Sequence, residues 1–356
     1  MLLSKTVLPN KTWTLRSFPE KQFCATENAE LLEEDLDLKN VDDDKIIVEV
    51  HAVSIDAFIR TMLDSNANPA HGGVGLNCPI PALGYGKVIR GNDKFKEGAM
   101  VTGLMQAAKY SVSGGEGMQK LVSLPRAPSS VFLHQMGISG IAAYIGMFVS
   151  PRKYPRKGET VVISAAAGAV GCIAAQMAKL CGARVVGIAG GEKKKEFLLK
   201  ELKLDGAVDY KSTTKTVAEQ LDEQCPDGID FFFDNVGGST LDCVLQRINL
   251  HARISICGAI SQYDSGKINN KQSIVGPAHY IKVAETSSTI SGFNMMHYQS
   301  HFLKAIGYLS WHYYRGNIVC PEHVEKGINS FAKSLEMLFA GGHCGRLIVD
   351  ISGDIE

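Results

Sequence analysis

Apolar and polar positions alternate along the second half of the chain in a regular series of short strands and longer helices. Thr160–Ser164 is a β-prone run that ends in an Ala/Gly turn, after which apolar residues recur at helical spacing as far as Cys181. Further strand-like runs follow at residues 184–189, 207–210, 229–238, 253–258 and 288–293. Strands that alternate with helices predict an α/β fold with a doubly wound parallel sheet.

The first part of the chain has a different pattern, with short strands separated by turn residues. Strand-like segments lie at residues 2–8, 46–50, 84–89, 98–103 and 118–124. This pattern predicts an antiparallel, β-rich domain, and the polar, proline-rich segment 125–130 is the expected crossing into the α/β domain. Because a strand at 346–350 is expected to return to the β-rich domain, we assign residues 1–130 and 316–356 to that domain and residues 131–315 to the α/β domain.

Composition limits the classes of partner. The chain has 356 residues, 45% of them hydrophobic, so both domains can bury a core. Lys and Arg together number 37, as do Asp and Glu, and this balance indicates neither a nucleic-acid nor an anionic-membrane partner. Nine cysteines without a C-x-x-C pair indicate reduced thiols in a cytoplasmic protein. Two uncharged runs, 131–150 and 161–178, are long enough to suggest membrane spans, but we expect a buried helix and a strand–turn–helix instead.

The turn after the first α/β strand is a candidate phosphate site. Its fingerprint is Ala166-x-Gly168-x-x-Gly171, in which alanine replaces the first glycine of a dinucleotide-binding turn. Small residues let the backbone approach a pyrophosphate, and the N–H groups at the helix N-terminus bind its charge. The motif is weak by itself, because many Gly/Ala turns bind nothing.

The tip of the second strand indicates which dinucleotide would bind. An NAD site has a carboxylate about twenty residues after the glycines, where it accepts from the ribose 2′-hydroxyl. Here the tip is Ala189-Gly190-Gly191, and the run Lys193–Lys195 follows shortly after it. The run is either a solvated face or a 2′-phosphate site. Because lysine is disfavoured near a helix N-terminus unless an anion is present, we predict NADPH as the cofactor.

These stretches resemble the zinc-independent medium-chain dehydrogenase/reductases, and most of all their prostaglandin reductase and plant double-bond reductase branch. The segments that match are 165–171, 187–190, 233–238 and 256–263. The resemblance implies a Rossmann-type NADP-binding domain beside a GroES-like β-rich domain, and a homodimer joined at the edge of the sixth strand. It also implies an ene-reductase that uses NADPH to reduce the carbon–carbon double bond of enals and enones, the class that includes 15-oxoprostaglandins.

The same resemblance implies roles for individual residues. The pyrophosphate turn would be Gly168, Ala169, Val170 and Gly171. Gly190 would lie at the ribose, Lys194 and Tyr210 would bind the 2′-phosphate, and His343 stands where the family has an asparagine. Asn235 would contact the cofactor farther along, and Cys257, Ser261, Tyr263 and Phe293 would surround the nicotinamide. The alternatives are that Cys257 is a core thiol, Asn235 a strand-end cap and Phe293 a packing residue.

No metal is predicted. Catalytic zinc requires about three Cys, His or carboxylate ligands. In the zinc-dependent relatives a cysteine stands at the position of Ser54 and a Gly-His-Glu at residues 84–86, which here are Gly-Tyr-Gly. His51, Asp56 and His71 do not replace these ligands at a suitable spacing.

Hydride transfer to the β-carbon of an enone requires a hydrogen-bond donor at the carbonyl oxygen, where negative charge develops. Tyr263 or the cofactor's ribose hydroxyl would be that donor, and Tyr263 or water would supply the proton. A set of aromatic and methionine side chains is predicted to line the substrate pocket, namely Phe58, Met62, Tyr85 and Tyr298. The alternative functions are an NADPH quinone oxidoreductase of the same superfamily and a non-catalytic NADPH-binding redox sensor.

Overall fold

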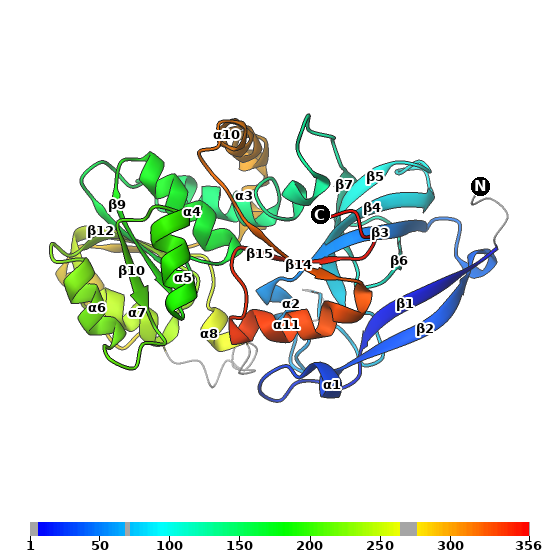
Figure 1. The fold of residues 1–356 in the computed structure, drawn as a ribbon, viewed down its shortest axis with the longest axis horizontal. Coiled ribbons are helices and arrows are strands. Elements are labelled where there is room, and N and C mark those ends of the chain that lie inside the picture. Colours follow the sequence, from blue (N-terminus) through cyan, green and yellow to red (C-terminus); the bar gives the residue numbers. More distant parts are fainter. Residues whose placement is uncertain (1–5, 68–71, 264–275, 356) are drawn as a thin grey trace.

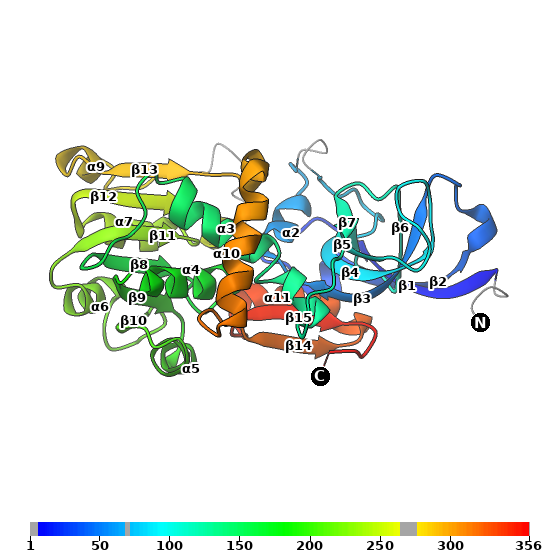
Figure 2. The same cartoon turned by 90° about the horizontal axis from the view of Figure 1, so that it is seen from above.

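The computed structural model describes residues 6–67, 72–263 and 276–355. Two lobes lie side by side along the long axis of the molecule, an α/β lobe and a β-rich lobe, and helix α10 (Phe302–Tyr314) stands at their junction (Figure 1; Figure 2). No helix in the described part of the chain is long and apolar enough to cross a membrane.

The α/β lobe contains a six-stranded parallel sheet with the order β10-β9-β8-β11-β12-β13. The strands are β8 (Thr160–Ser164), β9 (Arg184–Ala189), β10 (Gly206–Asp209), β11 (Ile229–Asp234), β12 (Ile248–Ile256) and β13 (Thr289–Gly292). The order reverses between β8 and β11, so the carboxyl ends of these strands border one crevice. The doubly wound parallel sheet predicted from the sequence is confirmed.

Helices cover both faces of this sheet. Val161 and Ile163 of β8 pack in one apolar cluster with α4 (Ala169–Leu180), α3 (Ile138–Tyr144) and α10, whereas Val162 packs in another with α6 (Val217–Gln224) and α7 (Gly238–Leu245). Successive residues of a strand point to opposite faces, so an uninterrupted apolar run is what a doubly covered strand requires. The uncharged run 131–150 forms α3 and flanking turns buried in the first cluster, as predicted.

The β-rich lobe contains a seven-stranded sheet with the order β14-β15-β3-β4-β5-β7, and β6 pairs with β3. Its strands are β3 (Ile46–Ser54), β4 (Pro81–Arg90), β5 (Met100–Gln106), β6 (Tyr110–Ser113), β7 (Met118–Lys120), β14 (Glu322–Lys326) and β15 (Arg346–Asp350). All pairs are antiparallel except β14 with β15. The C-terminal strand therefore returns to this lobe as expected, while the boundaries at 130 and 315 stay predictions.

A two-stranded sheet of β1 (Val7–Leu15) and β2 (Ala29–Asp37) extends away from the rest of the molecule (Figure 1). At the opposite end of the molecule, β13 is the outer strand of the parallel sheet, and Ile290 on it is 42% exposed. The homodimer expected through this edge stays a prediction.

A buried ion pair joins the returning strand β15 to the rest of the β-rich lobe. Arg346 donates from Nη1 and Nη2 to the two carboxylate oxygens of Asp56, each at 2.8 Å. Asp56 precedes α2 (Ala57–Met62) and also accepts a hydrogen bond of 2.7 Å from Ser54 Oγ. The Asp56 side chain is 9% exposed and the Arg346 side chain 4% exposed. Because both charges are largely removed from bulk water, each is stabilised mainly by the other.

We expect Asp56→Ala to lower the free energy of unfolding by about 3–5 kcal/mol, because it leaves the Arg346 guanidinium buried without its counter-charge. Urea denaturation measures this loss. The double variant Asp56→Ala/Arg346→Met should recover most of it, since both charges are then absent.

The matched control is Glu33→Ala, which breaks the exposed ion pair between Lys11 and Glu33 on the β1–β2 sheet. We expect this variant to lose less than about 1 kcal/mol. Equal losses for Asp56→Ala and Glu33→Ala would show that the buried pair has no special role.

Candidate functional site

The turn between β8 and α4 presents backbone N–H groups to the crevice. Ala165 adopts φ +49°, and Gly168 is the N-cap of α4 with φ −89° and ψ 173°. No side chain in the described residues caps this helix end, so the first N–H groups of α4 are available to an anion.

Close packing explains which residues of the fingerprint are glycine. A Cβ on Gly171 would lie 2.3 Å from the Ala165 oxygen, so any side chain there would push α4 away from the turn. Ala166, in place of the first glycine, is fully buried, and its Cβ lies 2.8 Å from the point where a Cβ on Gly187 would be. The extra methyl group therefore occupies the space that Gly187 leaves open on β9.

Three polar groups converge beside the tips of β9 and β10. Lys194 Nζ, Tyr210 Oη and Lys211 Nζ lie 3.6, 3.7 and 3.8 Å from the position of a Cβ on Gly341. The Tyr210 ring lies flat against Gly190, where a Cβ would be 2.7 Å from the ring. The structure thus brings Gly190, Lys194 and Tyr210 together as expected. It also adds Lys211, which sequence reasoning missed although it directly follows Tyr210.

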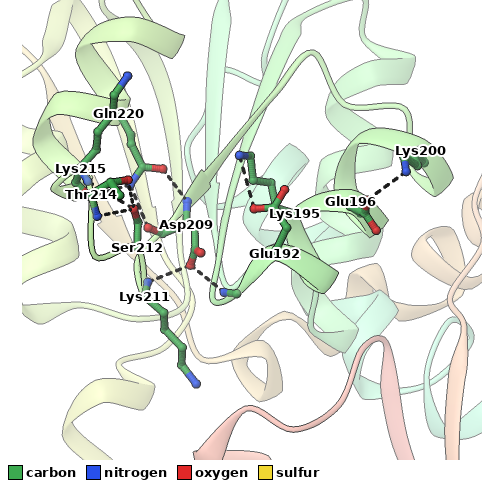
Figure 3. Close-up of polar contacts among 11 residues, drawn as sticks. Glu192, Lys195, Glu196, Lys200, Asp209, Lys211, Ser212, Thr214, Lys215 and Gln220 are labelled. Atoms are coloured by element: carbon green, nitrogen blue, oxygen red, sulfur yellow. Dashed lines mark hydrogen bonds and ion pairs between the residues drawn. The ribbon is translucent and has the colours of Figure 1, made fainter.

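Asp209 fixes the two strand tips relative to each other. Its Oδ1 accepts hydrogen bonds from the backbone N–H groups of Gly191 (2.6 Å) and Lys211 (2.8 Å). Figure 3 shows Asp209 between these turns, with Lys195 directed to Glu192 and Lys200 to Glu196. The Asp209 carboxylate thus accepts hydrogen bonds from backbone amides of both turns.

Lys194 differs electrostatically from the neighbouring lysines. It has no ion-pair partner in the described part of the chain. Burial lowers the pKa of Lys194, and the positive charge of Lys211 lowers it further, although Cys344 acts in the opposite direction. Two ammonium groups and a phenol at one point, without a paired carboxylate, form a site suited to a dianionic phosphate monoester.

Of these groups, Lys194 lines a cleft of about 280 Å³ between the lobes. One wall is formed by Gly190 and α5 (Glu192–Glu196), and the other by residues 321–323 and 341–344. His343 is in the second wall and is 7% exposed. Burial lowers the pKa of His343 to about 4, and the charges of Lys194 and His323 contribute, so the imidazole is neutral at neutral pH. Its Nδ1 has no hydrogen-bond partner among the described residues.

The segment 341–345 is attached to the pyrophosphate turn. Gly345 N–H donates to the Ala167 oxygen at 2.7 Å, and Gly345 pairs with Gly168 in a single parallel bridge. Gly345 has φ +72°, and a Cβ there would lie 1.9 Å from the Pro321 oxygen, so only glycine fits. Sequence reasoning missed this contact, which places the His343 wall directly over the turn.

The other end of the crevice is built around the carboxyl end of β11. Asn235 donates from Nδ2 to the Ser164 backbone oxygen at 2.7 Å, and its backbone N–H donates to Ser164 Oγ at 2.8 Å. Asn235 therefore links the ends of β8 and β11. This is the contact expected if Asn235 is a strand-end cap. Burial raises the pKa of Cys257 to about 12, so this thiol is neutral.

Tyr263 ends the short helix α8 (Ile260–Tyr263). Its phenol oxygen accepts a hydrogen bond of 3.0 Å from the Ala259 N–H, so its own proton remains available for donation. Burial raises the pKa of Tyr263, and the hydroxyl therefore stays protonated at neutral pH. Ser261 Oγ donates to the Val236 oxygen at 2.6 Å and ties α8 to the end of β11.

The structure separates the four predicted pocket residues. Helix α2, which contains Phe58 and Met62, is in contact with α8 beside the crevice (Figure 1), and Phe58 packs partly buried against the core of the β-rich lobe. Tyr85 is 4% exposed and packs in a core cluster with Leu133 and Ile348, so it does not line the crevice.

Phe293 and Tyr298 both pack partly buried against the first core cluster of the α/β lobe. A Cβ on Gly146 would lie 2.7 Å from the Phe293 ring and 2.5 Å from the Phe233 ring. Phe293 therefore packs closely against Gly146, as the alternative of a packing residue predicts.

The residues considered as metal ligands are engaged elsewhere. Asp56 is paired with Arg346, and His51 Nδ1 lies 3.1 Å from Asp354. His71 lies outside the described residues. Within the described ranges, no group of three or more His, Cys, Asp or Glu side chains is placed to hold a metal ion.

The chain is similar over most of its length to known oxidoreductases. A family model described as zinc-binding dehydrogenase matches residues 169–309, and one described as the N-terminal domain of oxidoreductase matches residues 11–121. Prostaglandin reductase 1 of Mus musculus is 32% identical over 343 residues, which cover 95% of this chain and 98% of that protein. The NADP(+)-dependent 2-alkenal reductase of Nicotiana tabacum is 30% identical over 329 residues, covering 90% and 93%.

A solved structure extends the likeness to three dimensions. CurA from Vibrio vulnificus in complex with NADPH is 28% identical and superposes with a TM-score of 0.85. The match covers 96% of this chain and 99% of that one.

Proposed function

The chain belongs to the zinc-independent branch of the medium-chain dehydrogenase/reductase family and is an NADP-dependent oxidoreductase, and we propose that it is an ene-reductase of enals and enones. The observation that most supports this reaction is the partly buried, protonated Tyr263 at the carboxyl edge of the sheet, on a helix in contact with the helix of Phe58 and Met62. A neutral donor beside an apolar wall suits an uncharged conjugated carbonyl compound.

The residues of the crevice divide the work of cofactor binding. We assign the N–H groups of Gly168–Gly171 to the pyrophosphate, and Lys194, Tyr210 and Lys211 to the 2′-phosphate. When bound, NADPH supplies the hydride. The neutral His343 borders the same cleft and can accept or donate a hydrogen bond without adding charge.

Tyr263 acts on the substrate oxygen in this proposal. As the hydride reaches the β-carbon, negative charge develops on the carbonyl oxygen, and the phenol donates a hydrogen bond to it. The Ala259 N–H holds the phenol oxygen in place and, by donating to it, makes the hydroxyl a better donor. The proton that reaches the α-carbon comes from Tyr263 or from water.

The experiment that tests the function measures NADPH oxidation with a 2-alkenal, an aryl enone and a quinone, and identifies the products. We expect the saturated aldehyde and ketone, with the quinone turned over more slowly. Faster formation of hydroquinone would favour a quinone oxidoreductase, and NADPH binding without turnover of any acceptor would favour a redox sensor.

Cofactor choice provides the second prediction. Lys194→Ala should weaken NADPH binding by about 1.5–3 kcal/mol, the value of a hydrogen bond to a charged group, and leave NADH binding nearly unchanged. Isothermal titration with both cofactors measures the difference. The control Lys195→Ala removes an equal charge that is directed to Glu192, so both affinities should stay within about twofold. Equal losses of NADPH and NADH affinity in Lys194→Ala would refute the phosphate assignment.

The role of Tyr263 provides the third prediction. Tyr263→Phe keeps the ring and removes the donor, so kcat on an enone should fall roughly tenfold to a thousandfold while the affinity for NADPH barely changes. The control is Tyr280→Phe, whose ring is 67% exposed just before α9 (Ile281–Glu285), at the opposite end of β13 from the crevice. Wild-type kcat in Tyr263→Phe on several enones would leave carbonyl activation to the cofactor's ribose hydroxyl.

A further inference from the structure

Two cysteine sulfurs meet behind the wall of the cofactor cleft. Cys172 is in the first turn of α4, and Cys320 lies 148 residues later in the connection between α10 and β14. The Cys172 Sγ lies 3.6 Å from the Cys320 Sγ and donates its proton toward it. None of the nine cysteines is in a disulfide, so this contact is between two reduced side chains.

Hydrogen bonds hold the two cysteines at this separation. Gln176, one helical turn after Cys172, donates to the Val319 oxygen at 2.7 Å and accepts from the Val319 N–H at 2.9 Å. Gln135 donates to the Ile318 oxygen at 3.1 Å. The residues that precede Cys320 are thus attached to α4 and to the segment just before α3, and the sulfur atoms are kept together by contacts that do not involve sulfur.

The two thiols have unequal environments. Cys172 is fully buried, and its pKa lies well above its ordinary value because of the contact with Cys320 and burial. Cys320 is partly exposed, and the hydrogen bond from Cys172 lowers its pKa, with a further contribution from the neighbouring His134. His134 is itself held by Glu322 at 2.7 Å, which favours the imidazolium. Cys320 is therefore the nucleophilic thiolate of the pair, and Cys172 is the protonated partner.

We propose that Cys172 and Cys320 form a redox-active dithiol, which a hydroperoxide oxidises reversibly to a disulfide. The Cys320 thiolate attacks the terminal peroxide oxygen and the O–O bond breaks, which gives a Cys320 sulfenic acid and an alkoxide that takes a proton from water to become an alcohol. Cys172 then attacks the Cys320 sulfur, and the hydroxyl group leaves with the Cys172 proton as water. Two thiols are oxidised by two electrons, one peroxide bond is reduced, and a dithiol reductant reverses the reaction.

The disulfide would alter the cofactor site. A disulfide bond is about 2.05 Å long, so the sulfur atoms must approach each other by about 1.5 Å. Cys172 lies directly after the pyrophosphate turn, and Pro321, next to Cys320, lines the cleft and accepts the Arg346 N–H at 2.8 Å. The approach therefore displaces either the first turn of α4 or the wall that contains Pro321, and NADPH binds more weakly.

The experiment treats the reduced, full-length protein with one equivalent of hydrogen peroxide, followed by alkylation, peptide mapping by mass spectrometry and titration with NADPH. We expect one cross-linked peptide containing residues 172 and 320, and a dissociation constant for NADPH at least threefold higher. Dithiothreitol should restore both to their starting values. These measurements do not depend on the substrate, so their failure is distinct from a failure of the proposed ene-reductase activity.

Variants separate the two cysteines. Cys172→Ala should stop at a Cys320 sulfenic acid that dimedone traps, whereas Cys320→Ser should leave Cys172 unreacted because it is buried and protonated. The control Cys225→Ala removes an equally buried thiol from the cluster on the other face of the sheet and should cross-link as the wild type does. Thermal melting confirms that each variant is folded.

Three results would overturn the proposal. The first is that both cysteines remain alkylatable while other thiols are oxidised. The second is that the cross-link forms without a change in NADPH affinity. The third is that Cys320→Ser is oxidised at Cys172 as fast as the wild type.

Discussion

The pairing of Asp56 with Arg346 is the constraint on which the crevice depends. Arg346 follows Gly345, so the same short segment binds Asp56 with its side chain and the pyrophosphate turn with its backbone N–H. A carboxylate engaged at both oxygens by a guanidinium is not free to bind a divalent cation, and the cation beside it repels one. The matching family model has the name zinc-binding dehydrogenase, yet at the position expected for a zinc-ligating cysteine this chain has Ser54, whose hydroxyl donates to the paired Asp56 carboxylate.

The crevice separates charge recognition from chemistry along its length. At the β9 and β10 tips, two lysines and a phenol attract an anion. At the β11 end, burial keeps Cys257 and Tyr263 in their neutral forms. His343 is also neutral, because burial and the nearby positive charges of Lys194 and Arg346 lower its pKa. One end of the crevice is thus suited to the charge of the cofactor, while the end near α2 is suited to an uncharged substrate.

Several site residues have structural roles that their chemistry alone does not reveal. Asn235 links two strand ends through Ser164, Phe293 packs beside Gly146, and Tyr85 is in the core of the β-rich lobe. Residues of these types occur in cores and at strand ends as often as in pockets, so sequence could not distinguish the roles. Gly341, Gly345 and Lys211 were missed for the opposite reason: each acts through a partner more than a hundred residues away in the chain.

The sequence by itself determined the features that depend on local pattern. The alternation of strands and helices specified the doubly wound sheet, and the Gly168–Gly171 turn with Gly190 and Lys194 gave the predicted phosphate end, because periodicity and turn chemistry act over a few residues. Only the tertiary structure decided which of these residues meet. It brought the 341–345 segment over the turn, paired Asp56 with Arg346, and placed Cys172 against Cys320. Such contacts join residues 148 to 290 positions apart, and packing of the whole chain, which no local pattern records, determines them.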